Sequence, residues 1–381
     1  PSCYPIQCMA DQYTLIQYLT RIQFDFGSIE LLPQELERLS VMRPLLITDP
    51  GVNESGHRRK VELLCAGIPV FKETPENPTE SAVSLALELF RQEQCDSLVA
   101  LGGGSAIDLA KAVALMATHP GCLEDYGVLK GGSKKIHPVT PLIAIPTTAG
   151  TGSEVGRACS ITLNNGSKVA CVSLNLVPSC AICDPELTLT LSAFLTAATG
   201  FDALSHGIES FLSTRINPPA EAIALDCVAR SGSWLKQAVV NGHNRDARWQ
   251  MMMAALEGGL TFQKGLGVVH ALSHPLGALG PHHGTLNAIL LPHALNYNER
   301  YVPEKFDQLK QTLKLRVGCD LVEWSKILAH ELGLPGSLSQ LGINKSELSK
   351  VAELAAKDHL LQTNPRPCNE EDLLGLLEEA L

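Results

Sequence analysis

The segment SLVALGGGSAIDLAKAVALMA, residues 97–117, determines the fold class of the first half of the chain. Its apolar opening is typical of a buried strand, its centre at Gly102 is a glycine-rich turn, and its remainder has helical periodicity. A second apolar run at 141–146 leads into another turn, rich in threonine, at 147–153. Strands that alternate with helices in this way predict βαβ units around a buried parallel sheet.

The second half of the chain lacks these strand signals. From about Asp184 onward helical patterns predominate, for example at 191–212 and 220–239. We therefore expect two domains, an α/β domain with a parallel sheet at residues 1–184 and an all-helical domain at residues 185–381. A chain of 381 residues is long enough to give each domain its own core.

The composition excludes some partners and indicates a cellular setting. The 30 lysines and arginines against 40 acidic residues give a net charge of −10, which argues against binding to nucleic acid or to an anionic membrane surface. No apolar run approaches the roughly 20 residues that span a bilayer. The twelve scattered cysteines indicate reduced thiols in the cytoplasm. The charged fraction of only 18%, below the typical ~25%, fits a large buried core and a homodimer or higher homo-oligomer.

The glycine-rich turn stands where a strand ends and a helix begins. Unpaired backbone N–H groups and the helix dipole favour an anion there, so the turn is a candidate phosphate site; a tight βα turn without a ligand is the alternative. Two further strand ends carry polar groups, Asp49 on one and Thr147, Thr148 and Thr151 on the other. Together the three strand ends predict a dinucleotide site. The Asp49 carboxylate favours NAD over NADP because it repels a 2′-phosphate.

Five of the twelve histidines gather at residues 270–293. His270 and His274 have the i, i+4 spacing of one helix face, and so have Asp202 and His206 earlier in the chain. One carboxylate together with neutral imidazoles suits Fe(II), Zn(II) or a similar divalent ion. We therefore expect a metal site, although the spacing alone does not say which histidines bind. The candidates in the histidine-rich stretch are His270, His274 and, in an expected loop, His282 and His283.

Five long stretches of this sequence occur together, in the same order, in a known enzyme family. They are GGGSAIDLAK at 102–111, PTTAGTGSE at 146–154, DPELT at 184–188, GFDALSHGIE at 200–209 and GLGVVHALSHPLGALGPHHGTLNAILLPH at 265–293. On these stretches the chain resembles the iron-activated (group III) alcohol dehydrogenases, essentially from end to end. The resemblance implies an N-terminal dinucleotide-binding domain, a C-terminal helical metal-binding domain of the dehydroquinate synthase-like superfamily, and an active site between them.

The resemblance also implies roles for individual residues. It assigns the metal ligands to Asp202, His206, His270 and His283. His282 is an alternative to His283, because the loop before it is one residue shorter than in the family. His274 falls beside the nicotinamide and the substrate, as the catalytic residue that relays the hydroxyl proton. The implied cofactor-binding residues are Asp49, Asn77, Gly103, Gly104, Ser105, Thr147, Thr148, Thr151, Lys168 and Leu187.

The implied reaction is reversible hydride transfer between NAD and a small alcohol or aldehyde, with Fe(II) or Zn(II) as the Lewis acid. If the substrate carries an acidic group, Lys264 and Arg157 are the candidate residues that bind it. The alternative for each of them is a structural role or a solvated side chain without a ligand. Three other interpretations compete with this one. They are a glycerol-type polyol dehydrogenase with Zn(II), a dehydroquinate synthase-like lyase, and a non-catalytic nucleotide- or metal-binding protein.

Overall fold

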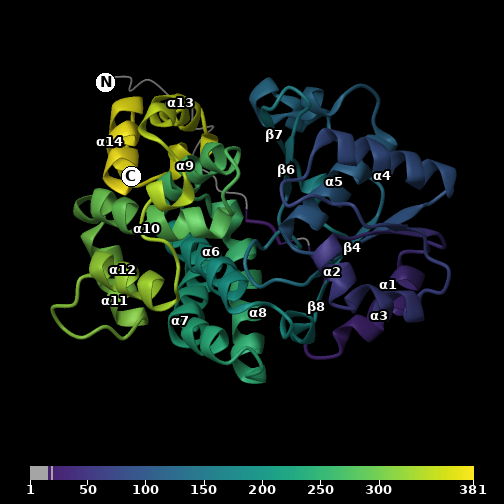
Figure 1. Ribbon diagram of the computed structural model, residues 1–381, viewed down its shortest axis with the longest axis horizontal. Coiled ribbons are helices and arrows are strands. Elements are labelled where there is room, and N and C mark those ends of the chain that lie inside the picture. The colour runs from purple at the N-terminus through teal and green to yellow at the C-terminus, as the bar shows by residue number, and fades with distance from the viewer. Residues whose placement is uncertain (1–15, 19) are drawn as a thin grey trace, which may run out of the picture.

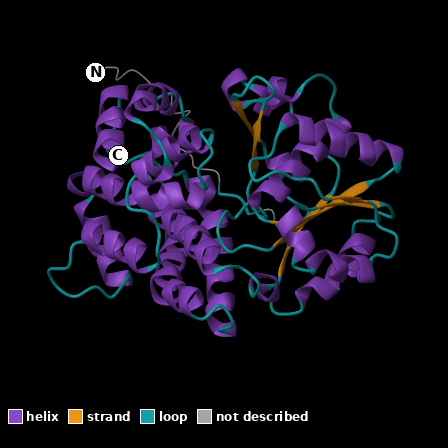
Figure 2. Ribbon diagram, viewed as in Figure 1, coloured by secondary structure: helices purple, strands orange, loops and turns teal. Residues whose placement is uncertain are grey.

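The computed structural model describes residues 16–18 and 20–381. Figure 1 shows two parts side by side, and Figure 2 shows that the strands belong to the first of them. Within the described residues the last strand, β8, is Cys180–Cys183, and helices make up the rest of the chain's regular structure. The predicted fold class, a parallel-sheet region followed by a helical region, is therefore confirmed. The exact domain ranges, 1–184 and 185–381, stay predictions.

A six-stranded sheet forms the centre of the first part. Its order is β1-β8-β5-β4-β2-β3, and each neighbouring pair is parallel. All residues of β2, β4, β5 and β8 are buried, which explains why their sequences are continuously apolar. The strands are β1 (Ile22–Phe24), β2 (Pro44–Ile47), β3 (Val70–Phe71), β4 (Ser97–Gly102), β5 (Leu142–Pro146) and β8 (Cys180–Cys183).

Helices cover both faces of this sheet. In β4, Leu98 and Ala100 pack into the apolar cluster of α4 and α5, whereas Val99 and Leu101 pack into that of α1 and α3. This alternation follows from the two-residue period of a strand. The helices of this part are α1 (Leu32–Arg38), α2 (Pro50–Glu54), α3 (His57–Leu64), α4 (Glu80–Gln92) and α5 (Gly104–Thr118).

A short antiparallel hairpin, which we did not predict, projects from the first part. It consists of β6 (Ala158–Thr162) and β7 (Lys168–Val172). Only alternate residues of its strands are buried, so its sequence lacks the continuous apolar run of the central strands. Lys111, fully buried on α5, donates hydrogen bonds to the carbonyl oxygens of Ser153, Gly156 and Ala158 at 2.7–2.9 Å. These bonds tie the threonine-rich turn and the hairpin to α5.

The second part is a bundle of helices with α6 at its centre. Helix α6 begins after Ser192, whose side chain caps the amide of Leu195, and 17 of its 20 residues are buried. It packs against α7, α8 and α10. Across the described residues, none of the helices is both long and apolar enough to cross a membrane. The helices are α6 (Ala193–Leu212), α7 (Pro218–Val240), α8 (Arg245–Leu260), α9 (Val268–Gly277), α10 (His283–Asn298), α11 (Pro303–Thr312), α12 (Leu321–Glu331), α13 (Lys345–Ala355) and α14 (Glu370–Ala380).

Candidate active site

Helix α6 carries two of the candidate metal ligands. Asp202 and His206 lie one turn apart and are both buried, with His206 Nε2 3.6 Å from Asp202 Oδ1. Gly258 on α8 faces His206, and a Cβ atom added at Gly258 would lie 3.1 Å from the His206 Cβ atom. The missing side chain therefore lets α8 pack closely behind the imidazole.

Two other helices bring further imidazoles to the same carboxylate oxygen. His270 Nε2 on α9 lies 3.5 Å from Asp202 Oδ1, and His283 Nε2 lies 3.7 Å from it. The prediction that His283 lies in a loop is wrong, because His283 is the first residue of α10. A Cβ atom added at Gly284 would lie 2.1 Å from the carbonyl oxygen of Ala198, so the start of α10 rests directly on α6. This close approach brings His283 to Asp202.

The spacing of these donor atoms fits a divalent metal ion. Tetrahedral bonds of ~2.0–2.2 Å separate neighbouring ligand atoms by about 3.3–3.6 Å. The observed separations from Asp202 Oδ1 to the three Nε2 atoms are 3.5–3.7 Å. Asp202, His270 and His283 also have ligand atoms that all lie within 4.8 Å of one another. A carboxylate with three imidazoles suits Fe(II) or Zn(II).

The electrostatics of the cluster suit metal binding as well. Burial raises the pKa of Asp202, but the surrounding imidazoles outweigh it and hold that pKa well below its usual range. Burial lowers the pKa of His206 to about 4 and that of His283 well below its ordinary value, so both are neutral at pH 7. For His270, burial is outweighed by Asp202 and Glu209, which raise its pKa to about 9. A metal ion that binds His270 must therefore displace a proton.

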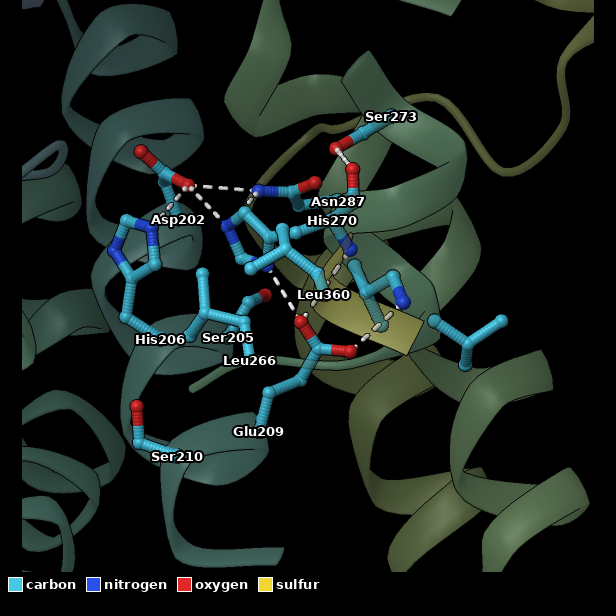
Figure 3. A network of polar contacts seen from close by, with 12 residues as sticks. Asp202, Ser205, His206, Glu209, Ser210, Leu266, His270, Ser273, Asn287 and Leu360 are labelled. Carbon is cyan, nitrogen blue, oxygen red and sulfur yellow. Dashed lines mark hydrogen bonds and ion pairs between the residues drawn. The ribbon is translucent and has the colours of Figure 1, made fainter. Parts of the chain in front are cut away.

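Two residues that we did not predict as part of the site, Glu209 and Asn287, hold the candidate ligands in this arrangement (Figure 3). Glu209 Oε2 accepts a hydrogen bond from His270 Nδ1 at 2.5 Å, which leaves His270 Nε2 facing Asp202. The Asn287 amide donates to Asp202 Oδ1 at 2.7 Å. Helical spacing was the available signal, because Glu209 is one turn beyond His206 and Asn287 one turn beyond His283.

Replacing Glu209 by Gln is expected to weaken metal binding by about 10- to 100-fold, because a charged partner that orients a ligating imidazole is lost. Titration of the holoprotein with a chelator, followed by metal analysis, measures this effect. Glu353→Gln is the matched control, since Glu353 is exposed on α13 and pairs only with Lys350 and Lys357 among the described residues. Equal metal retention in both variants would contradict the orienting role.

His274 and His282 lie outside the group of three ligand atoms that Asp202 forms with His270 and His283, and so does His206, although its Nε2 atom lies 3.6 Å from Asp202 Oδ1. The His274 ring centroid is 5.8 Å from that of His283, and its Nδ1 atom lies 2.8 Å from Asp358 Oδ2. The side chain of His274 is 44% exposed. Among the described residues, His282 makes no contact within 4 Å of the Asp202 carboxylate, whereas His283 does. The geometry thus favours His283 over its neighbour as a ligand.

Most of the candidate cofactor residues meet at the carboxyl ends of β2, β4 and β5. Asp49 follows β2 and accepts a hydrogen bond from the Val52 amide at 2.9 Å. A Cβ atom added at Gly102, the last residue of β4, would lie 2.8 Å from Asp49 Oδ2. A Cβ atom added at Gly104 would lie 2.7 Å from Thr151 Cγ2. Side chains at these glycines would fill the space where strand ends, turn and helix meet.

Other predicted cofactor residues extend this group in different directions. A Cβ atom added at Gly103 would lie 3.5 Å from the Thr148 side chain. The Thr147 amide donates a hydrogen bond to the Gly102 carbonyl oxygen. Ser105 donates a hydrogen bond to the Glu76 carbonyl oxygen.

Lys168 begins the hairpin strand β7 and links the two parts of the molecule. Its Nζ donates to Asn77 Oδ1 at 3.3 Å and lies 3.5 Å from where a Cβ atom of Gly277 on α9 would be. Leu187 differs from the other predicted cofactor residues, because its side chain is fully buried in the apolar core beside the sheet.

The two basic residues proposed as partners of an acidic substrate have different surroundings. Lys264 is fully buried, and its ammonium donates to the carbonyl oxygens of Ser210, Phe211 and Ser213 at 2.7–3.2 Å and pairs with Glu221 at 3.1 Å. Every donor of Lys264 is thus engaged inside the protein, and the hypothesis that it binds substrate is wrong. Arg157 instead lines a cavity.

Comparison with known proteins identifies the family. The profile of the iron-containing alcohol dehydrogenases matches residues 20–185, and that of the C-terminal region of the Fe-containing alcohol dehydrogenase family matches residues 196–381. A 4-hydroxybutyrate dehydrogenase from Cupriavidus necator is 45% identical over 379 residues, which cover 96% of this chain and 99% of the relative.

Solved structures agree with these sequence matches. A 1,3-propanediol oxidoreductase superposes with a TM-score of 0.90 at 35% identity, covering 96% of this chain and 100% of the other. A sulfoacetaldehyde reductase from Bifidobacterium kashiwanohense in complex with NAD+ superposes with a TM-score of 0.86 at 26% identity, covering 97% and 98% of the two chains. The two profile matches together, and each of the two solved structures alone, extend over the sheet and the helical bundle. The chain therefore belongs to the iron-containing alcohol dehydrogenase family and is an alcohol oxidoreductase.

Proposed function

We propose that this protein is an NAD-dependent, metal-assisted dehydrogenase that interconverts a small alcohol and its aldehyde. The observation that carries the proposal is the convergence of three imidazole Nε2 atoms on Asp202 Oδ1. In this proposal Asp202, His206, His270 and His283 are the ligands of Fe(II) or Zn(II). The preference for NAD is supported by Asp49 at the end of β2 and by the NAD+ complex of the sulfoacetaldehyde reductase.

The residues of the chain then have distinct tasks. A bound Fe(II) or Zn(II) supplies Lewis acidity toward the substrate oxygen. The glycine turn before α5 and the threonines after β5 bind the dinucleotide, with the unpaired amides of the helix start facing its phosphates. His274 relays the hydroxyl proton toward solvent: Asp358 accepts from His274 Nδ1, which leaves Nε2 available for proton transfer, and the ring is partly exposed.

The names of the relatives narrow the substrate to short alcohols. One relative is named for 4-hydroxybutyrate and one solved structure for 1,3-propanediol. Membership of an alcohol dehydrogenase family favours a dehydrogenase over a lyase or a non-catalytic binding protein. A polyol dehydrogenase with Zn(II) remains the competing enzyme, and a substrate panel with glycerol distinguishes it.

One assay tests the proposal directly. NADH formation is followed by its near-UV absorbance with 1,4-butanediol, 4-hydroxybutyrate and glycerol, with Fe(II) or Zn(II) added, and the purified protein is analysed for metal. We expect metal-dependent NADH formation from 1,4-butanediol or 4-hydroxybutyrate, whereas NADH from glycerol alone would favour the polyol dehydrogenase. A protein that binds metal but forms no NADH with any of these alcohols, and no NAD+ with the matching aldehydes, would contradict the proposed function.

Replacing Asp49 by Ser is expected to reduce the preference for NAD over NADP by about 10- to 100-fold in kcat/KM, because a like-charge repulsion of ~1.4–2.8 kcal/mol is removed. Serine keeps the cap on the Val52 amide, so the helix start is retained. Steady-state kinetics with both cofactors measure the ratio. Asp307→Ser, at an exposed position on α11, is the control, and an unchanged ratio in Asp49→Ser would contradict the role of the carboxylate.

The proposal includes a cellular setting and an assembly state. Ten cysteines of the described residues are free thiols, which supports a reducing compartment such as the cytoplasm. We propose a homodimer or a higher homo-oligomer, and light scattering of the purified protein measures the mass of the assembly.

A further inference from the structure

A cavity of about 390 Å³ lies beside the candidate metal centre. Its wall includes Phe262, whose ring packs edge-on against His206 with the two ring centroids 4.8 Å apart. Gly156 approaches the same ring, since its would-be Cβ atom lies 3.5 Å from Phe262 Cδ2. The Phe262 ring therefore lines the cavity and also contacts a candidate ligand, so one aromatic ring separates the cavity from His206.

The polar lining of this cavity is cationic. Two arginines, Arg157 and Arg215, face it together with neutral groups from Gln17, Tyr18 and Gln263, and no aspartate or glutamate is part of the lining. Arg215 is exposed at the cavity, whereas Arg157 is partly buried. Burial lowers the pKa of Arg157, and the nearby Arg215 lowers it further, which indicates that the two positive charges act on each other.

The two guanidinium groups make few hydrogen bonds to the described residues. Arg230, for comparison, donates to both Asp226 and Glu257. Among contacts between described residues, Arg215 donates one long hydrogen bond to the Gln263 carbonyl at 3.4 Å, and none is made by the Arg157 guanidinium. Because each guanidinium carries five N–H donors, most donors of the pair are not engaged by the residues that the structure describes.

We propose that Arg157 and Arg215 bind the anionic end of the substrate, a carboxylate or sulfonate, while its alcohol or aldehyde end reacts at the metal centre. The two arginines line the same cavity with no carboxylate in its described lining, and a guanidinium matches a carboxylate with paired hydrogen bonds. The inference rests on the proposed function and narrows its substrate to short hydroxy acids and their semialdehydes. The names of the 4-hydroxybutyrate dehydrogenase and the sulfoacetaldehyde reductase agree with an anionic substrate.

The anionic end takes no part in the chemistry. In the oxidation, the carbon that bears the hydroxyl loses a hydride to C4 of the nicotinamide, and the hydroxyl proton leaves to solvent. A hydroxy acid and NAD+ thus give the corresponding semialdehyde, NADH and a proton, and the carboxylate is unchanged. The two arginines therefore act as specificity-determining residues that hold the far end of the substrate.

The test compares two substrates of equal chain length that differ only at the far end, 4-hydroxybutyrate and 1,4-butanediol. In Arg215→Met and Arg157→Met we expect kcat/KM for 4-hydroxybutyrate to fall by about 10- to 100-fold, the effect of losing hydrogen bonds to a charged group. The value for 1,4-butanediol should stay within about threefold. Arg245→Met is the matched control, because Arg245 pairs with Glu186 and packs on Phe26 away from the cavity.

The outcomes separate this inference from the proposed function. Parallel losses on both substrates, or no loss on either, would overturn the assignment of the arginines. If the wild-type enzyme oxidises 1,4-butanediol and shows no preference for 4-hydroxybutyrate, the proposal of an anionic substrate is wrong. The proposed dehydrogenase function is not affected by that result.

Inhibition by butyrate tests whether the cavity binds the carboxylate of the substrate or a separate small acid that acts as an effector. Competitive inhibition against 4-hydroxybutyrate, weakened in Arg215→Met, supports the proposal. Non-competitive inhibition assigns the cavity to an effector and overturns it. Arg215→Lys adds a variant that keeps a positive charge at this exposed position, and partial recovery of 4-hydroxybutyrate oxidation is expected for it.

Discussion

Replacing Asp202 by Asn is expected to remove the bound metal and to lower kcat by at least ~1,000-fold. The neutral amide keeps the size of the side chain but loses the charge that three imidazoles face at 3.5–3.7 Å. A Lewis acid stabilises the transition state by several kcal/mol, and losing ~4 kcal/mol lowers a rate about 1,000-fold. Metal analysis of the purified variant, together with the NADH assay, measures both effects at once.

Two controls make the Asp202 result specific. Asp226→Asn alters an exposed partner of Arg230 on α7 and should retain metal and activity. Thermal unfolding of the Asp202→Asn apoprotein against the wild-type apoprotein shows whether the fold persists. A variant that lost its metal and kept its turnover would contradict the metal-assisted mechanism, and one that kept its metal would contradict Asp202 as a required ligand.

Replacing Lys264 by Met is expected to destabilise the protein by about 3–5 kcal/mol without changing its substrate preference. The Lys264 ammonium lies at the C-terminal end of α6, where it donates to three carbonyl oxygens. Lys305 also donates to those of Phe211 and Ser213, so a methionine at 264 removes the lysine donor of the Ser210 carbonyl and one of two such donors at the other carbonyls. Burial and neighbouring Lys305 lower its pKa to about 8, so it is still charged at pH 7. The same helix carries Asp202 and His206, so the loss reaches the metal centre through the helix.

Thermal unfolding measures this effect, and a fall in Tm on the order of 10 °C is expected. Lys236→Met, at an exposed position that pairs with Glu331, is the matched control and should change Tm by little. The ratio of kcat/KM for 4-hydroxybutyrate to that for 1,4-butanediol should be unchanged in Lys264→Met. A fall in that ratio with an unchanged Tm would restore Lys264 as a substrate-binding residue.

Much of the fold was predictable because its signals are local. The strands at 44–47, 97–102 and 142–146 are continuously apolar, since each is buried on both faces. The strands β1 and β3, with three and two residues, and the half-buried hairpin of β6 and β7 were not predicted. Such short or half-exposed strands have too few apolar residues to be distinguished from loops in the sequence. Whether these residues form strands depends on the strands with which they pair.

The candidate site was predictable where one helix holds two of its residues. The i, i+4 spacing places Asp202 and His206 on one face of α6 whatever surrounds the helix. The same argument would have found Glu209, which is one turn farther along. It could not have found Asp358, which lies 84 residues from its partner His274 and in a 3₁₀ cap rather than on a shared helix.

The sequence by itself therefore determined the parallel sheet, the helical second half and the residue types of a metal and dinucleotide site. Periodicity and spacing along one chain segment depend on backbone geometry alone, so they can be recognised without a structure. Only the tertiary structure favours His283 over His282 near Asp202 and shows that Lys264 is buried whereas Arg157 lines a cavity. Both outcomes depend on which distant element packs against the residue: α10 resting on α6 brings His283 to Asp202, whereas the end of α6 binds the Lys264 ammonium and Arg157 lines a cavity.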